Sequence, residues 1–116
     1  SRDPSELVVW GTGIARREFL YVDDAAEGVL ACVLAPKGAI INIGTGIETP
    51  ILELAKRVIS AHSLDIPIVL DTEKPDGQIR KVLDVQKARD LLGWEAHTSL
   101  NVGLSHTAKW YRSQPS

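Results

Sequence analysis

Short apolar runs bounded by glycine and proline set the pattern of the chain and predict its strands. Leu7-Val-Val-Trp10 is one such run, and it ends at Gly11, which predicts a strand that enters a loop. Residues 18–22 and 66–70 are two further candidates for short strands. The run 39–43 shows little alternation of apolar and polar residues, which is typical of a strand in a sheet covered on both faces.

A helix is predicted from Asp24 to about Leu34. Asp24 can cap its first turn, Glu27 can bond back to the cap, and Pro36 lies just beyond its end. Because this helix is apolar on most of its faces, we expect it to be buried against a large partner.

Three more helices are predicted further along the chain. Thr49 caps the first of them, and Pro50 occupies its first position. Asp84 caps the second, which ends at Gly93, and Ser99 begins the third. The residues expected to face inward on the first and third are Ile51, Leu54, Ala55, Val58 and Ile59, and Leu100, Leu104, Thr107 and Tyr111. The mixture of strands and helices predicts an α/β fold, or α+β for this chain in isolation.

Composition and charge narrow the class of protein. The chain has 116 residues, of which 44% are hydrophobic and 24% charged, as in ordinary soluble globular proteins. A net charge of −2 gives no general attraction to nucleic acid or to an anionic membrane, and no apolar run is long enough to span a bilayer. The single cysteine, Cys32, fits a cytoplasmic location.

Metal and nucleophile chemistry are not indicated. His62, His97 and His106 share no ligand spacing with one another or with Cys32, so we expect no metal site. Capping of a helix explains the acidic pair at 23–24, and we expect no catalytic residue in this chain.

The loop after the first strand is the first candidate for ligand binding. Trp10 precedes the Gly-Thr-Gly turn, and Arg17 lies seven residues after Trp10. An indole can stack on a nucleobase and an arginine fork can hold a phosphate, so together they suit a nucleoside diphosphate. The alternative is a core tryptophan with solvated arginines.

The second candidate is Lys74-Pro-Asp-Gly77, whose proline and glycine positions predict a β-turn. Asp76 can accept hydrogen bonds from sugar hydroxyls, and Lys74, Arg80 and Lys81 can meet phosphate. The alternative is an ordinary surface turn.

Taken in order, six segments resemble the C-terminal part of extended short-chain dehydrogenases/reductases of the NAD-dependent epimerase/dehydratase family. The likeness is greatest to members that act as epimerase/reductases on GDP-sugars. The segments are Val9-Trp-Gly-Thr-Gly13, Arg17-Glu-Phe-Leu-Tyr-Val-Asp-Asp24, Asn42-Ile-Gly-Thr-Gly46, Lys74-Pro-Asp-Gly77, Arg80-Lys-Val-Leu-Asp84 and Leu92-Gly-Trp94.

The resemblance implies a role for four residues. Trp10 would line the nucleotide pocket, Arg17 would contact the diphosphate, and Asp76, with Arg80 near by, would help to bind the nucleotide sugar. Residues 1–116 would form one substrate-binding fragment, and NADP or NAD would bind to a Rossmann domain upstream of it. Because no Gly-x-Gly-x-x-Gly and no Tyr-x-x-x-Lys occurs here, we expect no cofactor binding and no catalysis by this chain alone.

This interpretation has one consequence for the isolated chain, and two alternatives to it remain open. Loss of the Rossmann partner would uncover apolar side chains, so we expect the chain to self-associate; these side chains are Val29, Leu30, Val33, Ile41 and Ile43. The alternatives are another nucleotide-sugar enzyme, such as a UDP-hexose 4-epimerase, and a non-catalytic module that binds nucleotide sugars.

Overall fold

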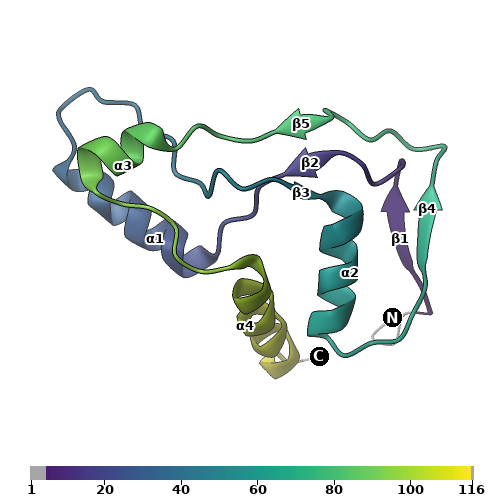
Figure 1. Cartoon of the computed structure of the whole chain (residues 1–116). Coiled ribbons are helices and arrows are strands. Elements are labelled where there is room, and N and C mark those ends of the chain that lie inside the picture. Colours follow the sequence, from purple (N-terminus) through teal and green to yellow (C-terminus); the bar gives the residue numbers. More distant parts are fainter. Residues whose placement is uncertain (1–4, 116) are drawn as a thin grey trace.

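Two small sheets organise the described residues, 5–115, of the computed structural model (Figure 1). Strand β1 (Leu7–Trp10) runs parallel to β4 (Ile68–Asp71), with Leu7 opposite Ile68. In the second sheet β2 (Arg16–Arg17) is central; it pairs antiparallel with β3 (Thr49–Pro50) and parallel with β5 (Arg80–Lys81). The predicted strands at 7–10 and 66–70 are therefore present, the second shifted toward the C-terminus.

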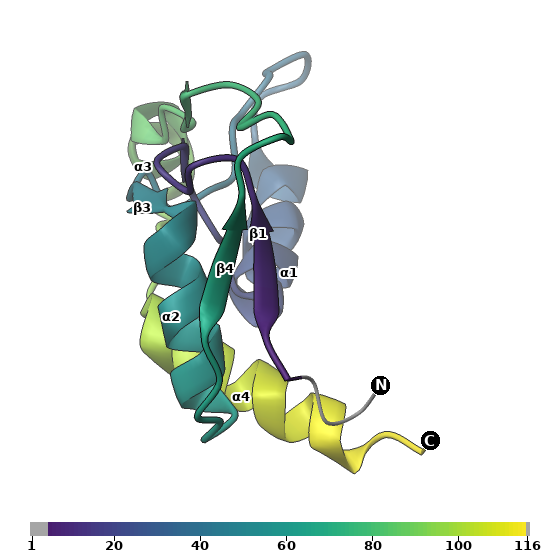
Figure 2. The same cartoon turned by 90° about the vertical axis from the view of Figure 1, so that its right-hand side faces the viewer.

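The helices surround these sheets in an open frame (Figures 1 and 2). Helix α2 stands beside the β1–β4 pair and packs against α4, while α1 and α3 lie together at the other end of the molecule. Their bounds are α1 Val22–Ala31, continued by the 3₁₀ turn η1 Cys32–Leu34, α2 Ile51–Ala61, α3 Gln86–Leu92 and α4 Leu100–Ser113. The α/β fold class expected from the sequence is confirmed.

The predicted strand at 18–22 and the predicted cap at Asp24 are wrong. Helix α1 already begins at Val22, and no side chain bonds to its first turn. Between β2 and α1, Glu18 bonds to other segments instead of a neighbouring strand: its carboxylate accepts from the N–H groups of Gly46 at 3.3 Å and Leu83 at 2.9 Å. The predicted end of the helix near Leu34 is confirmed, with a tighter last turn.

Two further expectations in the middle of the chain are also wrong. No strand forms over 39–43, because no other segment within residues 5–115 pairs with it there; Ile40 is 83% exposed, although Ile41 and Ile43 are half-buried. Thr49 does not cap a helix, because its backbone pairs with Arg17 in the sheet and α2 begins two residues later.

The C-terminal helices largely follow the sequence. Ser99 accepts a hydrogen bond from the N–H of Val102 at 3.2 Å, and Gly93 ends α3 at a left-handed φ of 62°. Asp84 accepts from the N–H of Gln86 at 3.0 Å and lies two residues before the start of α3, so Val85, not Asp84, is in the cap position. Tyr111 is 63% exposed, so the expectation that it faces inward is wrong.

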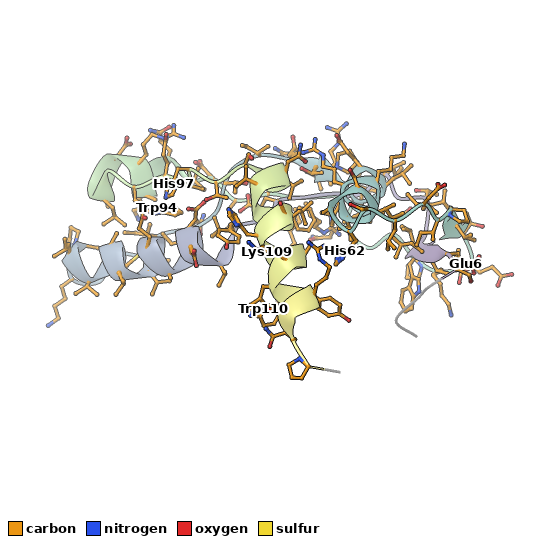
Figure 3. The ribbon with its side chains drawn as sticks, turned by 90° about the horizontal axis from the view of Figure 1, so that it is seen from below. Glu6, His62, Trp94, His97, Lys109 and Trp110 are labelled. Atoms are coloured by element: carbon orange, nitrogen blue, oxygen red, sulfur yellow. The ribbon has the colours of Figure 1, made fainter. Side chains whose placement is uncertain are left out.

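Asp24 joins α1 to the segment that precedes α4. It is fully buried, and its carboxylate accepts from the N–H groups of His97 at 3.2 Å and Thr98 at 2.9 Å, and from the Thr98 hydroxyl at 3.0 Å. Nε2 of His97 lies 3.0 Å from the same carboxylate. Figure 3 shows His97 at this junction, with Trp94 close by between α3 and α1.

The apolar core is thin for a chain of this length. Its buried apolar residues are Val9, Ala15, Ala55, Ala88, Trp94 and Ala108, most of them small. The radius of gyration is 16.7 Å, against about 13 Å for a compact chain of this size. Polar contacts between segments therefore carry an unusual share of the structure.

We predict that Asp24→Ala lowers the free energy of unfolding by about 3 kcal/mol, because it removes a fully buried acceptor and leaves the part-buried donors of His97 and Thr98 without a partner. Asp23→Ala, at the exposed neighbouring position, is the matched control and should change it by no more than about 0.5 kcal/mol. Urea unfolding followed by circular dichroism measures both. Equal losses in the two variants would contradict this assignment.

Candidate functional site

The glycine loop after β1 is held by the carboxylate of Asp76. Oδ1 accepts from the N–H of Thr12 at 2.8 Å and of Gly13 at 3.3 Å, and Oδ2 accepts from the Thr12 hydroxyl at 2.8 Å. Gly11 has a φ of 76°, and a Cβ at this position would lie 2.3 Å from Oδ1 of Asp76. Only glycine fits there, for its backbone conformation and for the space.

The same loop also caps helix α2 with its carbonyl groups. The N–H of Ile51 bonds to the carbonyl of Ala15, and the N–H of Leu52 to that of Gly13, both at 2.9 Å. Free N–H groups in glycine loops and at helix starts are the usual anion-binding groups of nucleotide sites. Here these donors are already bonded within the protein.

The hydrogen bonds from Thr12 lower the pKa of Asp76 below its ordinary value; the hydroxyl contributes most and then the N–H. Burial opposes them, and the N–H of Gly13 lowers the pKa further. Asp76 is therefore a carboxylate at neutral pH, as its contacts with three donors require.

The Lys74–Gly77 segment lies against this loop, although not as the predicted β-turn. The hydrogen-bonded turn is three residues earlier, where the N–H of Lys74 bonds to the carbonyl of Asp71 at 3.1 Å. Nζ of Lys74 lies 5.5 Å from the centre of the Trp10 ring, and Trp10 is 61% exposed. This is a cation–π contact that leaves much of the indole accessible.

The side chain of Arg17 approaches the same segment at Gly77. Its Nη1 donates to the carbonyl of Arg16 at 2.8 Å, and a Cβ at Gly77 would lie 3.4 Å from its Nη2. The residues 74–77 thus contact Trp10, the glycine loop and the neighbourhood of Arg17. The structure brings together three of the four predicted site residues: Trp10, Arg17 and Asp76.

Arg80, the fourth, faces away from Arg17. Arg80 is the register partner of Arg16, whereas Lys81 is the partner of Arg17, and partners in adjacent strands share a face of the sheet. Arg80 is also ion-paired with Glu48. Lys81 is exposed and has no ion pair among the described residues, so the cation on the Arg17 face is Lys81.

Sequence reasoning missed Thr12 and did not separate Lys81 from Arg80. Thr12 stands between two glycines, a position that gives no sign of its bond to a carboxylate 64 residues away. The choice between Lys81 and Arg80 depends on strand register, which a two-residue strand does not reveal in sequence.

Other polar surfaces are satisfied internally. A groove between α2 and α4 is lined by charged side chains, but Arg57 there donates to Glu53 at 2.7 Å and to Asn101 at 3.3 Å. Within residues 5–115, no three His, Cys, Asp or Glu side chains are grouped so as to hold a metal ion. None of the helices described is long and apolar enough to cross a membrane.

The lowered pKa of Asp76 predicts a loss of stability in acid. Above about pH 4 the carboxylate is ionised in both the folded and the unfolded chain, and its contacts contribute fully. As the pH falls further, the unfolded chain takes up the proton first, so the free energy of unfolding decreases toward the folded pKa. Asp76→Asn should remove this part of the acid slope, as measured by urea unfolding between about pH 6 and pH 3.

Glu73→Gln is the matched control, because Glu73 is exposed in the same segment. It should keep the part of the slope that Asp76→Asn removes. An acid slope that is identical in the wild-type chain and in Asp76→Asn would refute this prediction.

Comparison with known proteins supplies the relatives of this fold. A model of the NAD dependent epimerase/dehydratase family matches residues 1–44. The chain is 42% identical over 108 residues to a probable GDP-L-fucose synthase 1 of Oryza sativa subsp. japonica, covering 92% of this chain and 33% of that protein. It is 38% identical over 121 residues to the GDP-L-fucose synthase of Escherichia coli K12, with coverages of 96% and 37%.

A solved structure agrees with these relatives. The UDP-glucose 4-epimerase of Thermotoga maritima, determined with UDP-glucose, superposes with a TM-score of 0.84 at 31% identity, over 92% of this chain and 35% of that one. The likeness to GDP-sugar enzymes expected from the sequence is confirmed. This chain is similar to members of the NAD-dependent epimerase/dehydratase family of extended short-chain dehydrogenases/reductases, and it spans about a third of the length of the relatives it matches.

Proposed function

We propose that this chain binds the nucleoside diphosphate part of a nucleotide sugar, with a GDP-sugar favoured. The observation that carries the proposal is the meeting of Trp10, Lys74 and Arg17 at one segment, 74–77. An exposed indole with one cation over its ring and a second cation at the other end of the same short segment suits a base and its diphosphate. The base preference follows the relatives named GDP-L-fucose synthase.

The charges of the second sheet also favour an anionic ligand. Arg16 lies opposite Arg80, and Arg17 lies opposite Lys81, in a chain whose net charge is −2. Like charges directly opposite each other destabilise a sheet. Glu48 neutralises part of this repulsion at Arg80, and a diphosphate bound on the Arg17 face would offset the rest.

In this proposal the chain is the substrate-binding part of an epimerase/reductase and has no catalytic activity alone. The family name implies NAD or NADP, but the residues here do not fit a dinucleotide. In the glycine loop the N–H groups of Thr12 and Gly13 are bonded to Asp76, and at the start of α2 those of Ile51 and Leu52 are bonded to loop carbonyls. Cofactor binding and hydride transfer therefore belong to residues outside this sequence, in the same longer chain or in another chain.

The second candidate is a UDP-sugar enzyme of the 4-epimerase type. The structural likeness to the Thermotoga maritima enzyme, which was determined with UDP-glucose, favours it. The two candidates differ in the base, so binding of GDP and UDP to the same protein separates them.

We also propose that the isolated chain self-associates through the exposed face of α1 and η1. The accessible surface is 8214 Å², against about 6,200 Å² for a compact monomer of 12.6 kDa. The excess is larger than the roughly 800 Å² that one partner buries in a standard interface. Val29, Leu30, Val33 and Leu34 contribute to it, and each is at least 63% exposed.

For ligand binding, we predict that GDP binds with a dissociation constant on the order of 0.1–1 mM, and more tightly than UDP. Arg17→Ala should weaken binding by about tenfold or more through loss of a charged hydrogen bond, and Trp10→Ala by about tenfold through loss of stacking. Arg89→Ala is the control, because Arg89 is on α3 and pairs with Glu95 at 3.0 Å. Titration by NMR measures all four proteins.

Tighter binding of UDP would replace the GDP-sugar proposal by the UDP-sugar one. Absence of binding by either nucleotide at several millimolar, or equal losses in Arg17→Ala and Arg89→Ala, would overturn the proposed site.

For self-association, we predict that the sedimentation coefficient of the chain rises with concentration over the micromolar range. Leu30→Ser combined with Val33→Ser should shift this rise to higher concentration, because both side chains lie on the exposed face. Val102→Ser, at an exposed position of α4, is the control. A monomer at all concentrations would sink the proposal.

A further inference from the structure

The donors of the glycine loop bind an anion that belongs to the protein itself, the side-chain carboxylate of Asp76. Successive N–H groups of Thr12 and Gly13 point at one carboxylate oxygen, and the Thr12 hydroxyl donates to the other. Adjacent backbone N–H groups that converge on one atom form the concave sites in which proteins bind anions. In this protein a residue from 63 or 64 positions further along the chain occupies that place.

The bonds to the glycine loop also hold Trp10, the residue directly before the loop. Trp10 is joined to Thr12 through Gly11, whose N–H bonds to the carbonyl of Asp71 at 2.8 Å. Lys74, two residues before Asp76, lies over the Trp10 ring. The 71–76 segment therefore holds the loop through a backbone bond, a carboxylate and an ammonium group, while the indole stays exposed.

We propose that Asp76 is a positioning residue that holds the Trp10 loop in the shape that accepts a nucleotide, by occupying the loop's own anion site. This rests on the proposed function for the ligand, but the hold on the loop exists in the free chain. The arrangement also keeps external phosphate out of the glycine loop and leaves the Arg17 and Lys81 face to receive it.

Three of the roughly four acceptor positions of a carboxylate are used in these bonds. The contribution of Asp76 to binding is then made chiefly through Thr12 and Gly13. This distinguishes positioning from the direct contact with sugar hydroxyls that the residue type allows, and the two roles predict different results in a double-mutant cycle.

The first experiment is amide hydrogen exchange on the free chain. Asp76→Ala should speed exchange at Thr12 and Gly13 by about tenfold or more, because their acceptor is lost. It should also shift the indole N–H resonance of Trp10, which is assigned by its absence in Trp10→Phe. Asp76→Asn keeps an acceptor oxygen and should restore most of the protection, and Glu73→Ala should match the wild-type chain. Unchanged exchange in Asp76→Ala overturns the proposal.

The second experiment is a cycle of Thr12→Val, Asp76→Ala and the double variant, with GDP as the probe. If Asp76 acts through Thr12, Thr12→Val weakens binding although Thr12 is not proposed to touch the ligand, and the double variant binds no worse than Asp76→Ala. Fully additive losses would mean that Asp76 contacts the ligand directly, which overturns the positioning role. Loss of loop protection in a chain that binds no nucleotide at all would leave the hold on the loop established and reject the proposed function instead.

Discussion

Three carboxylates, bonded to backbone N–H groups 28 to 74 residues away, hold the elements of this chain together. Asp24 ties α1 to the segment before α4, Asp76 ties the loop after β1 to the segment after β4, and Glu18 bonds to two further loops. The buried apolar residues are few and mostly small, so hydrophobic burial between the two ends of the frame is limited. Hydrogen bonds to a charged group are stronger than those between neutral groups. A single carboxylate can therefore join two elements that share little buried apolar surface.

This construction explains where the candidate site lies. Its parts come from three segments that are remote in sequence: the loop after β1, strand β2, and residues 74–77. They meet because β1 pairs with β4 and β2 pairs with β5. The segment between β1 and β2 therefore lies beside the segment between β4 and β5. Asp76 then fixes the loop against the returning segment. A ligand-binding surface on two short strands has little rigidity of its own, and the carboxylate supplies it by satisfying three donors at once.

Local elements and helix ends could be predicted from the sequence better than the contacts between residues that are remote along the chain. Strand β1, the end of α3 at Gly93 and the cap at Ser99 follow from local patterns, because each depends on a few neighbouring residues. Asp24 shows the limit: its position is that of a helix cap, but its carboxylate bonds to residues 73 and 74 positions away. The run 39–43 shows another limit, because a strand forms only where a second strand supplies its hydrogen bonds.

The Gly-Thr-Gly turn shows that a sequence motif typical of phosphate binding does not by itself identify a phosphate site. In sequence it resembles a phosphate loop, but in the structure its three N–H groups are bonded within the protein, and so are those of Ile51 and Leu52 at the start of α2. An external phosphate at this place would have to displace Asp76 and would lie beside a carboxylate of lowered pKa, a repulsive neighbour at neutral pH. The cations of β2 and β5 offer the opposite environment a short distance away, with Arg17 and Lys81 on one face. For the proposed nucleotide ligand, the charges therefore favour the sheet face of Arg17 and Lys81 over the glycine turn.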